Sequence, residues 1–336
     1  MIRNTLFSLL AIASTSTAAA IKKCDNSTGS LRVENFLNPA QSLDVVSSLI
    51  IGSEAAVIID LPLAVPQADA LAQWVKNTTD KPLVAAFSTH SHPDHYLSGA
   101  AFLAKFPETK YYANSKSVEL IKGEANSKIQ QWKGILGEDS IVDNVTLPTP
   151  YDFTFFALPG DEATPIYLVS PVVGDTIDET AFWIPSISTV IVGDLVYSRT
   201  MHLWVSDSLT TALSEAWLST LDFIESLGAK RIIPGHSLTL EDFDATTDLQ
   251  HTRDYVTFFK DEVQAKGEDA FTPKEIFSLI DNKFPGLLSN ESTTSATLLN
   301  ITSEQFGKDG TRQAHFTDFT AFNNLTELNG WQLTNA

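Results

Sequence analysis

The sequence predicts a mixed α/β fold, of the α+β type, in which two β-sheets pack together and helices cover their outer faces. Runs rich in β-branched and aromatic residues are followed by amphipathic helical stretches, and this order of strands and then helices occurs twice along the chain. The repeated order suits two sheets packed back to back with helices outside. The chain has 336 residues, 43% hydrophobic and 19% charged, which is enough for a substantial core.

The first half of the chain predicts four strands and three helices in alternation. In order, the elements are two strands, a helix, a strand, a helix, a strand and a helix, over residues 42–52, 54–62, 66–79, 81–89, 97–106, 110–114 and 115–132. Gly52 and Ser53 between the first two strands indicate a hairpin. The first helix places four apolar side chains on one face: Ala68, Leu71, Ala72 and Val75. Residues 81–89 are a short continuous apolar run, which is typical of a buried strand.

The second half again begins with strands and continues with helices. Four strands are predicted first, followed by a helix, a strand and a largely helical region, over residues 151–158, 166–173, 180–186, 189–194, 209–228, 230–237 and 241–284. From residue 285 onward the pattern weakens into sequence rich in serine, threonine and asparagine. We therefore expect one domain over residues 21–284 and a C-terminal extension over residues 285–336 that packs on or near it.

Residues 1–20 have the features of a secretory signal peptide. Arg3 gives a basic start, an apolar stretch follows, and small residues up to Ala20 suit cleavage. The apolar stretch is too short to span a bilayer, and no later segment reaches about 18 continuous apolar residues. The single cysteine, Cys24, allows no intrachain disulfide. Six N-x-[ST] sequons favour a secreted eukaryotic glycoprotein: Asn26, Asn77, Asn144, Asn290, Asn300 and Asn324.

The charge of the chain narrows the class of ligand. The formal net charge is −19, whereas binding to nucleic acid needs a basic surface. Long-range repulsion also disfavours polyanionic substrates. We therefore expect a small-molecule substrate and no nucleic-acid partner.

One short stretch, FSTHSHPDHYLSGA over residues 87–100, holds three of the seven histidines. His90 and His92 are separated by one residue, so in an extended segment both side chains project to the same side. Asp94 and His95 follow on the loop after Pro93. Neutral imidazole and carboxylate are metal ligands, and the end of a strand is a firm platform for them.

Two further polar residues follow buried strands in the same way. Asp194 comes after the strand in VIVGDLVY, and His236 comes after the strand in RIIPGHS. An apolar strand, a glycine and then one polar residue is a frequent way to present a ligand into a cleft. A turn residue is the alternative interpretation of Asp194 alone, but its order with the histidine stretch and His236 favours a ligand.

The order THSHPDH, GDT, GDLVY and PGHS resembles the metallo-β-lactamase superfamily, and the resemblance extends over about residues 43–260. It implies a four-layer αβ/βα sandwich, here in a secreted, fungal-type member, with two divalent ions at one edge between the sheets. The ions implied are Zn²⁺ first, with Mn²⁺ or Fe²⁺ as alternatives. The first metal would be held by His90 and His92. Position by position, the second metal would be held by Asp94, His95 and His236, with Asp194 bridging the two.

The chain departs from this family at one ligand. The family's third histidine for the first metal is replaced by Asp175, nineteen residues before Asp194. Asp175 is a direct ligand in the interpretation that we favour; alternatively the first site is weak, or His202 takes the place. A carboxylate instead of a neutral imidazole lowers the net charge of the site by one. The bound water should then be less acidified, and Mn²⁺ or Fe²⁺ become more suitable ions.

The resemblance also implies hydrolysis, in which a metal-bound hydroxide attacks the carbonyl of a small ester, lactone or amide. Asp94 would orient the nucleophile and pass its proton to the leaving group. Three residues near the ligands in sequence are candidates for contacts behind the metals or with substrate: His202, Tyr197 and Tyr96. The alternative is a catalytically silent metal- or ligand-binding protein on the same fold. Metal content and turnover would distinguish the two.

Overall fold

The structure is a computed structural model that describes residues 31–240, 243–268, 270–288 and 292–312. Among these residues, no helix combines the length and the apolar character that a membrane span requires. Several predictions fall outside the described residues, namely the signal peptide, Cys24 and the sequons at Asn26, Asn290 and Asn324.

The first sheet has six strands in the order β1-β2-β3-β4-β5-β6. The pairs β1-β2 and β2-β3 are antiparallel, whereas β3 to β6 are parallel to one another. The predicted hairpin is confirmed, since Gly52 N–H donates to the carbonyl of Ala55 between β2 and β3. The strands are β1 Arg32–Asn38, β2 Val45–Ile51, β3 Ala56–Ile59, β4 Leu83–Phe87, β5 Lys110–Ala113 and β6 Thr149–Pro150.

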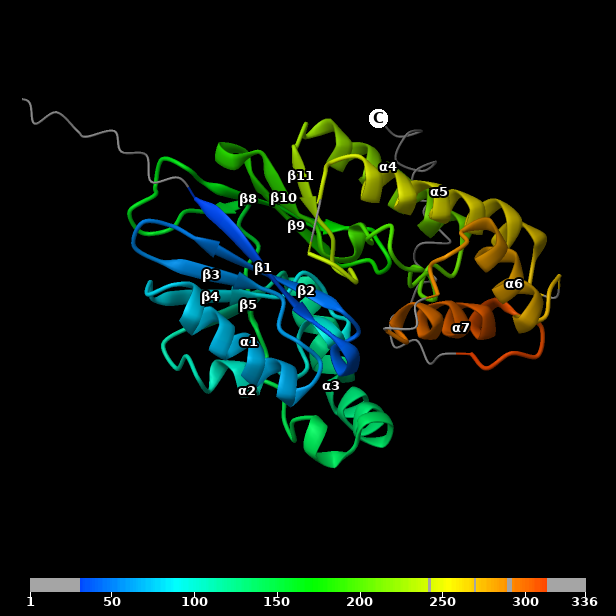
Figure 1. Cartoon of the computed structure of the whole chain (residues 1–336), viewed down its shortest axis with the longest axis horizontal. Coiled ribbons are helices and arrows are strands. Elements are labelled where there is room, and N and C mark those ends of the chain that lie inside the picture. The colour runs from blue at the N-terminus through cyan, green and yellow to red at the C-terminus, as the bar shows by residue number, and fades with distance from the viewer. Residues whose placement is uncertain (1–30, 241–242, 269, 289–291, 313–336) are drawn as a thin grey trace, which may run out of the picture.

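Three helices lie along the outer face of this sheet, in the lower part of the view (Figure 1). They are α1 Val65–Thr78, α2 Gly99–Leu103 and α3 Ser115–Leu136. Helix α1 buries the four apolar side chains that its spacing predicts, Ala68, Leu71, Ala72 and Val75. Helix α3 begins at a side-chain cap, because Asn114 accepts a hydrogen bond from the backbone N–H of Ser117.

The second sheet has five strands in the order β11-β10-β9-β8-β7. Only β10 and β11 are parallel neighbours. The strands are β7 Phe155–Phe156, β8 Ile166–Val172, β9 Glu179–Ile184, β10 Thr189–Ile191 and β11 Arg231–Ile233. Helices α4 and α5 lie over this sheet, with α6 and α7 at their side (Figure 1). These helices are α4 Thr211–Ser226, α5 Thr247–Glu262, α6 Pro273–Lys283 and α7 Thr294–Phe306.

Three apolar layers of buried side chains separate helices, first sheet, second sheet and helices, which shows that the sheets form a sandwich. Strand β3 illustrates the arrangement, because Ile58 packs against α1 to α3 while Val57 and Ile59 pack into the layer between the sheets. The second sheet completes that middle layer with residues such as Phe182. A third layer, which includes Trp217 of α4, joins the second sheet to α4–α7. The predicted four-layer sandwich is therefore confirmed.

Some predicted elements differ from those observed. The run over residues 151–158 is not one strand, because Tyr151 N–H donates to Ala113 at the edge of the first sheet whereas Phe155 pairs with Tyr167 in the second. The segment thus crosses between the sheets. Helix α2 is also shorter than predicted, ending at Leu103.

Several observed elements are absent from the sequence prediction, among them β1 and α7. Strand β1 carries polar residues at several positions, which conceals its alternation. Helix α7 buries serine and threonine side chains along with Leu298 and Leu299, so its inward face does not stand out as apolar. It packs in the same layer as α4, α5 and α6.

Candidate metal centre

The histidine-rich segment lies at the carboxyl end of β4, between the two sheets. Pro93–His95 forms a single 3-10 turn, which turns the chain back immediately after His92. The hydroxyl of Ser88 donates to the carbonyl of His95 at 2.9 Å and closes the loop. This fold places the imidazoles of His90, His92 and His95 together, with ring centroids 4.2–4.7 Å apart for the neighbouring pairs.

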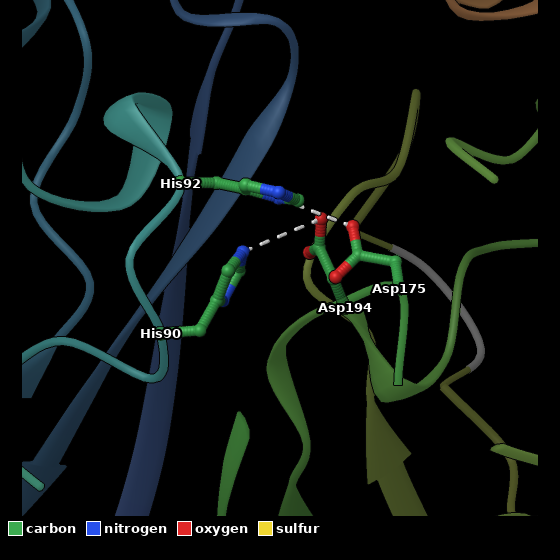
Figure 2. A group of neighbouring side chains, drawn as sticks. All are labelled: His90, His92, Asp175 and Asp194. Atoms are coloured by element: carbon green, nitrogen blue, oxygen red, sulfur yellow. Dashed lines mark ion pairs between the residues drawn. The ribbon is translucent and has the colours of Figure 1, made fainter. Parts of the chain in front are cut away.

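The first group of candidate ligands combines residues from both sheets. Figure 2 shows His90 and His92 on one side, facing Asp175 and Asp194 on the other. One ligand atom from each residue lies within 4.8 Å of the others. His92 Nδ1 is 3.2 Å from Asp175 Oδ2, and His90 Nε2 is 4.0 Å from Asp194 Oδ2.

The second group contains Asp94, His95 and His236. His236 Nε2 lies 3.2 Å from Asp94 Oδ2 and 3.3 Å from His95 Nε2. The carboxylate of Asp194 also reaches this group, at 3.1 Å from His236 Nε2 and 3.3 Å from His95 Nε2. Asp194 therefore lies between the two groups. The structure brings together all the predicted ligands: His90, His92, Asp94, His95, Asp175, Asp194 and His236.

Unsatisfied buried atoms show that this donor set suits cations. His90 Nε2, Asp175 Oδ1 and Asp194 Oδ1 are buried and have no hydrogen-bond partner among the described residues. Burial first, and then the nearby imidazoles, lower the pKa of His90 well below its ordinary value, so its ring is neutral. Burial raises the pKa of Asp175 to about 6. A divalent ion would compensate such buried carboxylates, and neutral imidazole with carboxylate is a donor set that zinc accepts.

Each histidine in the two groups has a polar group close to its other ring nitrogen, and such groups help to orient a ligand ring. His90 Nδ1 is hydrogen-bonded to the hydroxyl of Thr89 at 2.9 Å and also lies 3.3 Å from Glu179, and His95 Nδ1 lies 2.9 Å from Asp60. His236 Nδ1 donates to the carbonyl of Leu43 at 2.7 Å. For His92 the neighbouring group is Asp207, whose Oδ2 lies 2.8 Å from His92 Nε2.

The sequence interpretation did not include the carboxylates beside these rings, namely Asp60, Glu179 and Asp207. Asp60 had a signal, because it follows the apolar strand β3 just as Asp194 follows β10. It adopts φ 64° and accepts hydrogen bonds from the backbone and hydroxyl of Thr89. Glu179 and Asp207 follow no such pattern.

The three candidates for contacts behind the metals or with substrate have different positions. Tyr197 is buried beside both groups, and its hydroxyl lies within hydrogen-bond distance of Asp175 at 2.8 Å and of Asp194 at 2.6 Å, with one proton to share between them. Tyr96 is buried, and its hydroxyl has no hydrogen-bond partner among the described residues. His202 belongs to neither group of ligands, since its ring lies against Tyr255 and Asp281 of the C-terminal helices.

Two glycines let the strand ends approach closely at Asp194. Gly193 has φ +53°, and a Cβ there would lie 2.7 Å from the hydroxyl of Thr89. A Cβ on Gly235 would lie 1.9 Å from Asp194 Oδ1. The GD and PGH sequences therefore supply space as well as ligands.

Comparison with known proteins establishes the family. The sequence model described as the metallo-beta-lactamase superfamily matches residues 42–236. The chain belongs to the metallo-β-lactamase superfamily. It is 24% identical over 211 residues to a type 2 metallo-β-lactamase of Bacteroides fragilis, covering 62% of this chain and 73% of that one. It is 26% identical over 194 residues to a metallo-β-lactamase of Chryseobacterium indologenes, covering 56% and 70%.

The solved structure of a larger enzyme shares the fold. The stereoselective inverting sec-alkylsulfatase of a Pseudomonas species superposes with a TM-score of 0.55 at 17% identity. The match covers 84% of this chain but 51% of that one, so the chain spans about half of the length of the alkylsulfatase. At this identity the likeness shows the fold alone. These relatives are hydrolases by name, and hydrolases make up most of the metallo-β-lactamase superfamily.

The departure from the superfamily pattern at Asp175 predicts a measurable loss. Asp175→Ala is expected to remove about one metal equivalent and to lower activity at least about 10-fold, because its carboxylate faces His92 in the first group. Asp175→His should instead raise the charge of the site by one and move the acid limb of the rate profile to lower pH. Metal analysis and pH–rate profiles check both. Two metals bound to Asp175→Ala as tightly as to the parent would exclude Asp175 as a ligand.

Proposed function

We propose that this protein is a metal-dependent hydrolase that cleaves a small ester, lactone or amide at its carbonyl group. The observation that carries the proposal is the position of Asp194, whose carboxylate lies within 4.0 Å of His90 on one side and within 3.3 Å of His95 and His236 on the other. Two candidate ligand groups that share one carboxylate form the arrangement expected of a two-metal site.

The donor groups define which residues would hold each ion. The first ion would bind to His90, His92 and Asp175, and the second to Asp94, His95 and His236, with Asp194 shared. Bound there, the ions would supply Lewis-acid chemistry, which acidifies water toward neutral pH and polarises a carbonyl oxygen. Zn²⁺ suits these donors, and the carboxylate of Asp175 also suits Mn²⁺ or Fe²⁺.

Asp94 is the residue proposed to move the proton. Its side chain is 10% exposed, and its Oδ2 lies 3.2 Å from His236 Nε2 at the second group. A carboxylate held there accepts a proton from the attacking water and returns it to the leaving group. Tyr197 places its hydroxyl between Asp175 and Asp194 and shares its one proton between their carboxylates, which restrains both side chains.

The net charge and the relatives support the proposed substrate class. A net charge of −19 disfavours polyanionic substrates, so small neutral molecules are the favoured substrates. The β-lactamase relatives support cyclic amides as probes, and the alkylsulfatase supports an alkyl sulfate as a comparison. None of these names identifies the natural substrate.

The test is metal analysis joined to a panel of lactones, simple esters, β-lactams and an alkyl sulfate. About two metal equivalents, with turnover of at least one carbonyl substrate that stops on chelation and returns with Zn²⁺ or Mn²⁺, is the expected result. Less than half an equivalent, with no turnover after the metals are added, would support a silent binding protein instead. Turnover of the alkyl sulfate alone would replace the carbonyl substrate class.

We also propose that the protein is secreted and glycosylated. The sequons within the described residues support this, since Asn77, Asn144 and Asn300 are exposed. Material recovered from the medium of a eukaryotic host is expected to begin near Ile21 and to lose mass on treatment with an N-glycosidase. Secreted material that begins at Met1 would contradict the proposed signal peptide.

A further inference from the structure

The segment between β10 and α4 presents a carboxylate to the first ligand group from outside it. This segment, residues 198–210, is called the Asp207 loop here. Asp207 Oδ2 is within hydrogen-bond distance of His92 Nε2, at 2.8 Å, and accepts a second hydrogen bond from Trp204 Nε1 at 3.0 Å. The Trp204 ring also meets the His92 ring edge to face, with centroids 5.9 Å apart. Asp207 Oδ2 therefore connects His92, a candidate metal ligand, to Trp204 of the same loop.

His92 needs such a partner more than the other candidate ligands do. Its side chain is 18% exposed, whereas those of His90, His95 and His236 are 0–2% exposed. His92 also presents Nδ1 to the first group, at 3.2 Å from Asp175, so that its Nε2 points outward. Without an acceptor at Nε2, only the contacts of Nδ1 and packing on a partly open side would hold the ring.

The Asp207 loop is itself fixed by helices that lie beyond the segment shared with the superfamily, which ends at residue 236. The backbone N–H of His202 donates to Ser295 of α7 at 2.7 Å. His251 of α5 lies 3.1 Å from the carbonyl of Met201. At the far end of the loop, Gln264 donates to the carbonyl of Ser208.

We infer that Asp207 is a positioning residue that orients His92 for metal binding in the first group, and that α5 and α7 hold the loop that carries it. A carboxylate behind a metal-bound imidazole fixes the ring and raises its basicity. This inference rests on the proposed function only in needing a metal at the first group. It assigns a role in the metal centre to the C-terminal helices, outside the part of the chain that the superfamily model covers.

The test is the affinity of the full chain for Zn²⁺, measured by competition with a chromophoric chelator after the protein has been stripped of metal. The Asp207 variants are made in the parent and in a His236→Ala background. In that background the second group is disabled, so the Zn²⁺ affinity of the first group is measured directly. Asp207→Ala is expected to weaken Zn²⁺ binding about 10- to 100-fold in that background. Asp207→Asn keeps an acceptor oxygen, so a smaller loss is expected.

Two further variants separate positioning from a general loss of structure. Asp261→Ala removes an exposed carboxylate at the end of α5 that pairs with Lys260, and should leave Zn²⁺ affinity unchanged. Ser295→Ala removes the hydrogen bond from His202 N–H to α7 and touches no ligand, so a loss of affinity at the first group supports the role of the helices. Circular dichroism identifies any unfolded variant, and Asp207→Asn then still decides the question.

The outcomes distinguish this inference from the proposed function. Unchanged Zn²⁺ affinity in Asp207→Ala or, if that variant is unfolded, in Asp207→Asn overturns the inference while leaving hydrolysis intact. A parent that binds two metals but turns over nothing in the panel overturns the hydrolase, while a loss of affinity in Asp207→Ala still supports the inference. A parent that binds no Zn²⁺ overturns both.

Discussion

His90→Ala and His92→Ala are each expected to abolish hydrolysis and to remove the metal from the first group. Each change deletes an imidazole donor, and the remaining carboxylates of Asp175 and Asp194 would repel one another without it. Because partners behind metal ligands already change affinity or activity 10- to 100-fold, loss of a ligand itself should lower activity by at least about 100-fold. The apolar layers that hold the sheets together do not include either ring.

Metal stoichiometry, turnover and far-ultraviolet circular dichroism measure this result together. Ser91→Ala provides a matched control, because Ser91 lies between the two histidines and contacts Asp178 instead of the clustered ligands. It should keep both metals and activity close to that of the parent. Full activity in either histidine variant would rule out a first metal site built on these residues.

Gly235→Ala should disable the metal centre without altering any ligand. The added Cβ would lie 1.9 Å from Asp194 Oδ1 and 2.6 Å from the carbonyl carbon of Gly193. The backbone has little freedom to retreat, because Gly235 N–H donates to Val196 at 3.2 Å and its carbonyl accepts from Val46 at 2.8 Å. Asp194 must therefore move. Since it lies between both groups, both metals should weaken and activity should fall by about 100-fold or more.

Glycine to alanine in helix α3 gives the comparison for Gly235→Ala. A Cβ on Gly123 would have nothing within 4 Å, so Gly123→Ala should leave the metals alone and stabilise the helix by about 0.5–1 kcal/mol. Thermal unfolding and metal analysis of the two variants measure the contrast. Parental metal content and turnover in Gly235→Ala would show that the strand ends tolerate a side chain there.

Local patterns in the sequence predicted the elements that bury an apolar face. The spacing of Ala68, Leu71, Ala72 and Val75 is enough to define the inner face of α1. The same reasoning failed for α7, whose inner face contains hydroxyl side chains such as Ser295 that satisfy backbone groups of another segment. A pattern of apolar residues carries no information about such partners.

The candidate site divides in the same way. Ligands that follow a strand, such as His90 and Asp194, could be located because the end of a strand fixes where the chain is. Asp207 could not, since it lies in a loop whose course is set by contacts with α5 and α7, far away in the sequence. The position of a side chain behind a ligand depends on tertiary packing that no local pattern encodes.

Because the ligands are divided between the two sheets, metal binding depends on the docking of the sheets during folding. His90, His92, Asp94 and His95 follow β4 of the first sheet, whereas Asp175, Asp194 and His236 come from loops of the second. Neither half of the chain alone holds a full ligand set, so the metal centre is completed only when the sheets dock. An ion that binds the docked state and not the open chain stabilises it by about 4 kcal/mol at 1,000 times its dissociation constant. Metal that is available while the protein folds would then stabilise the docked arrangement of the two sheets, in addition to any role in chemistry.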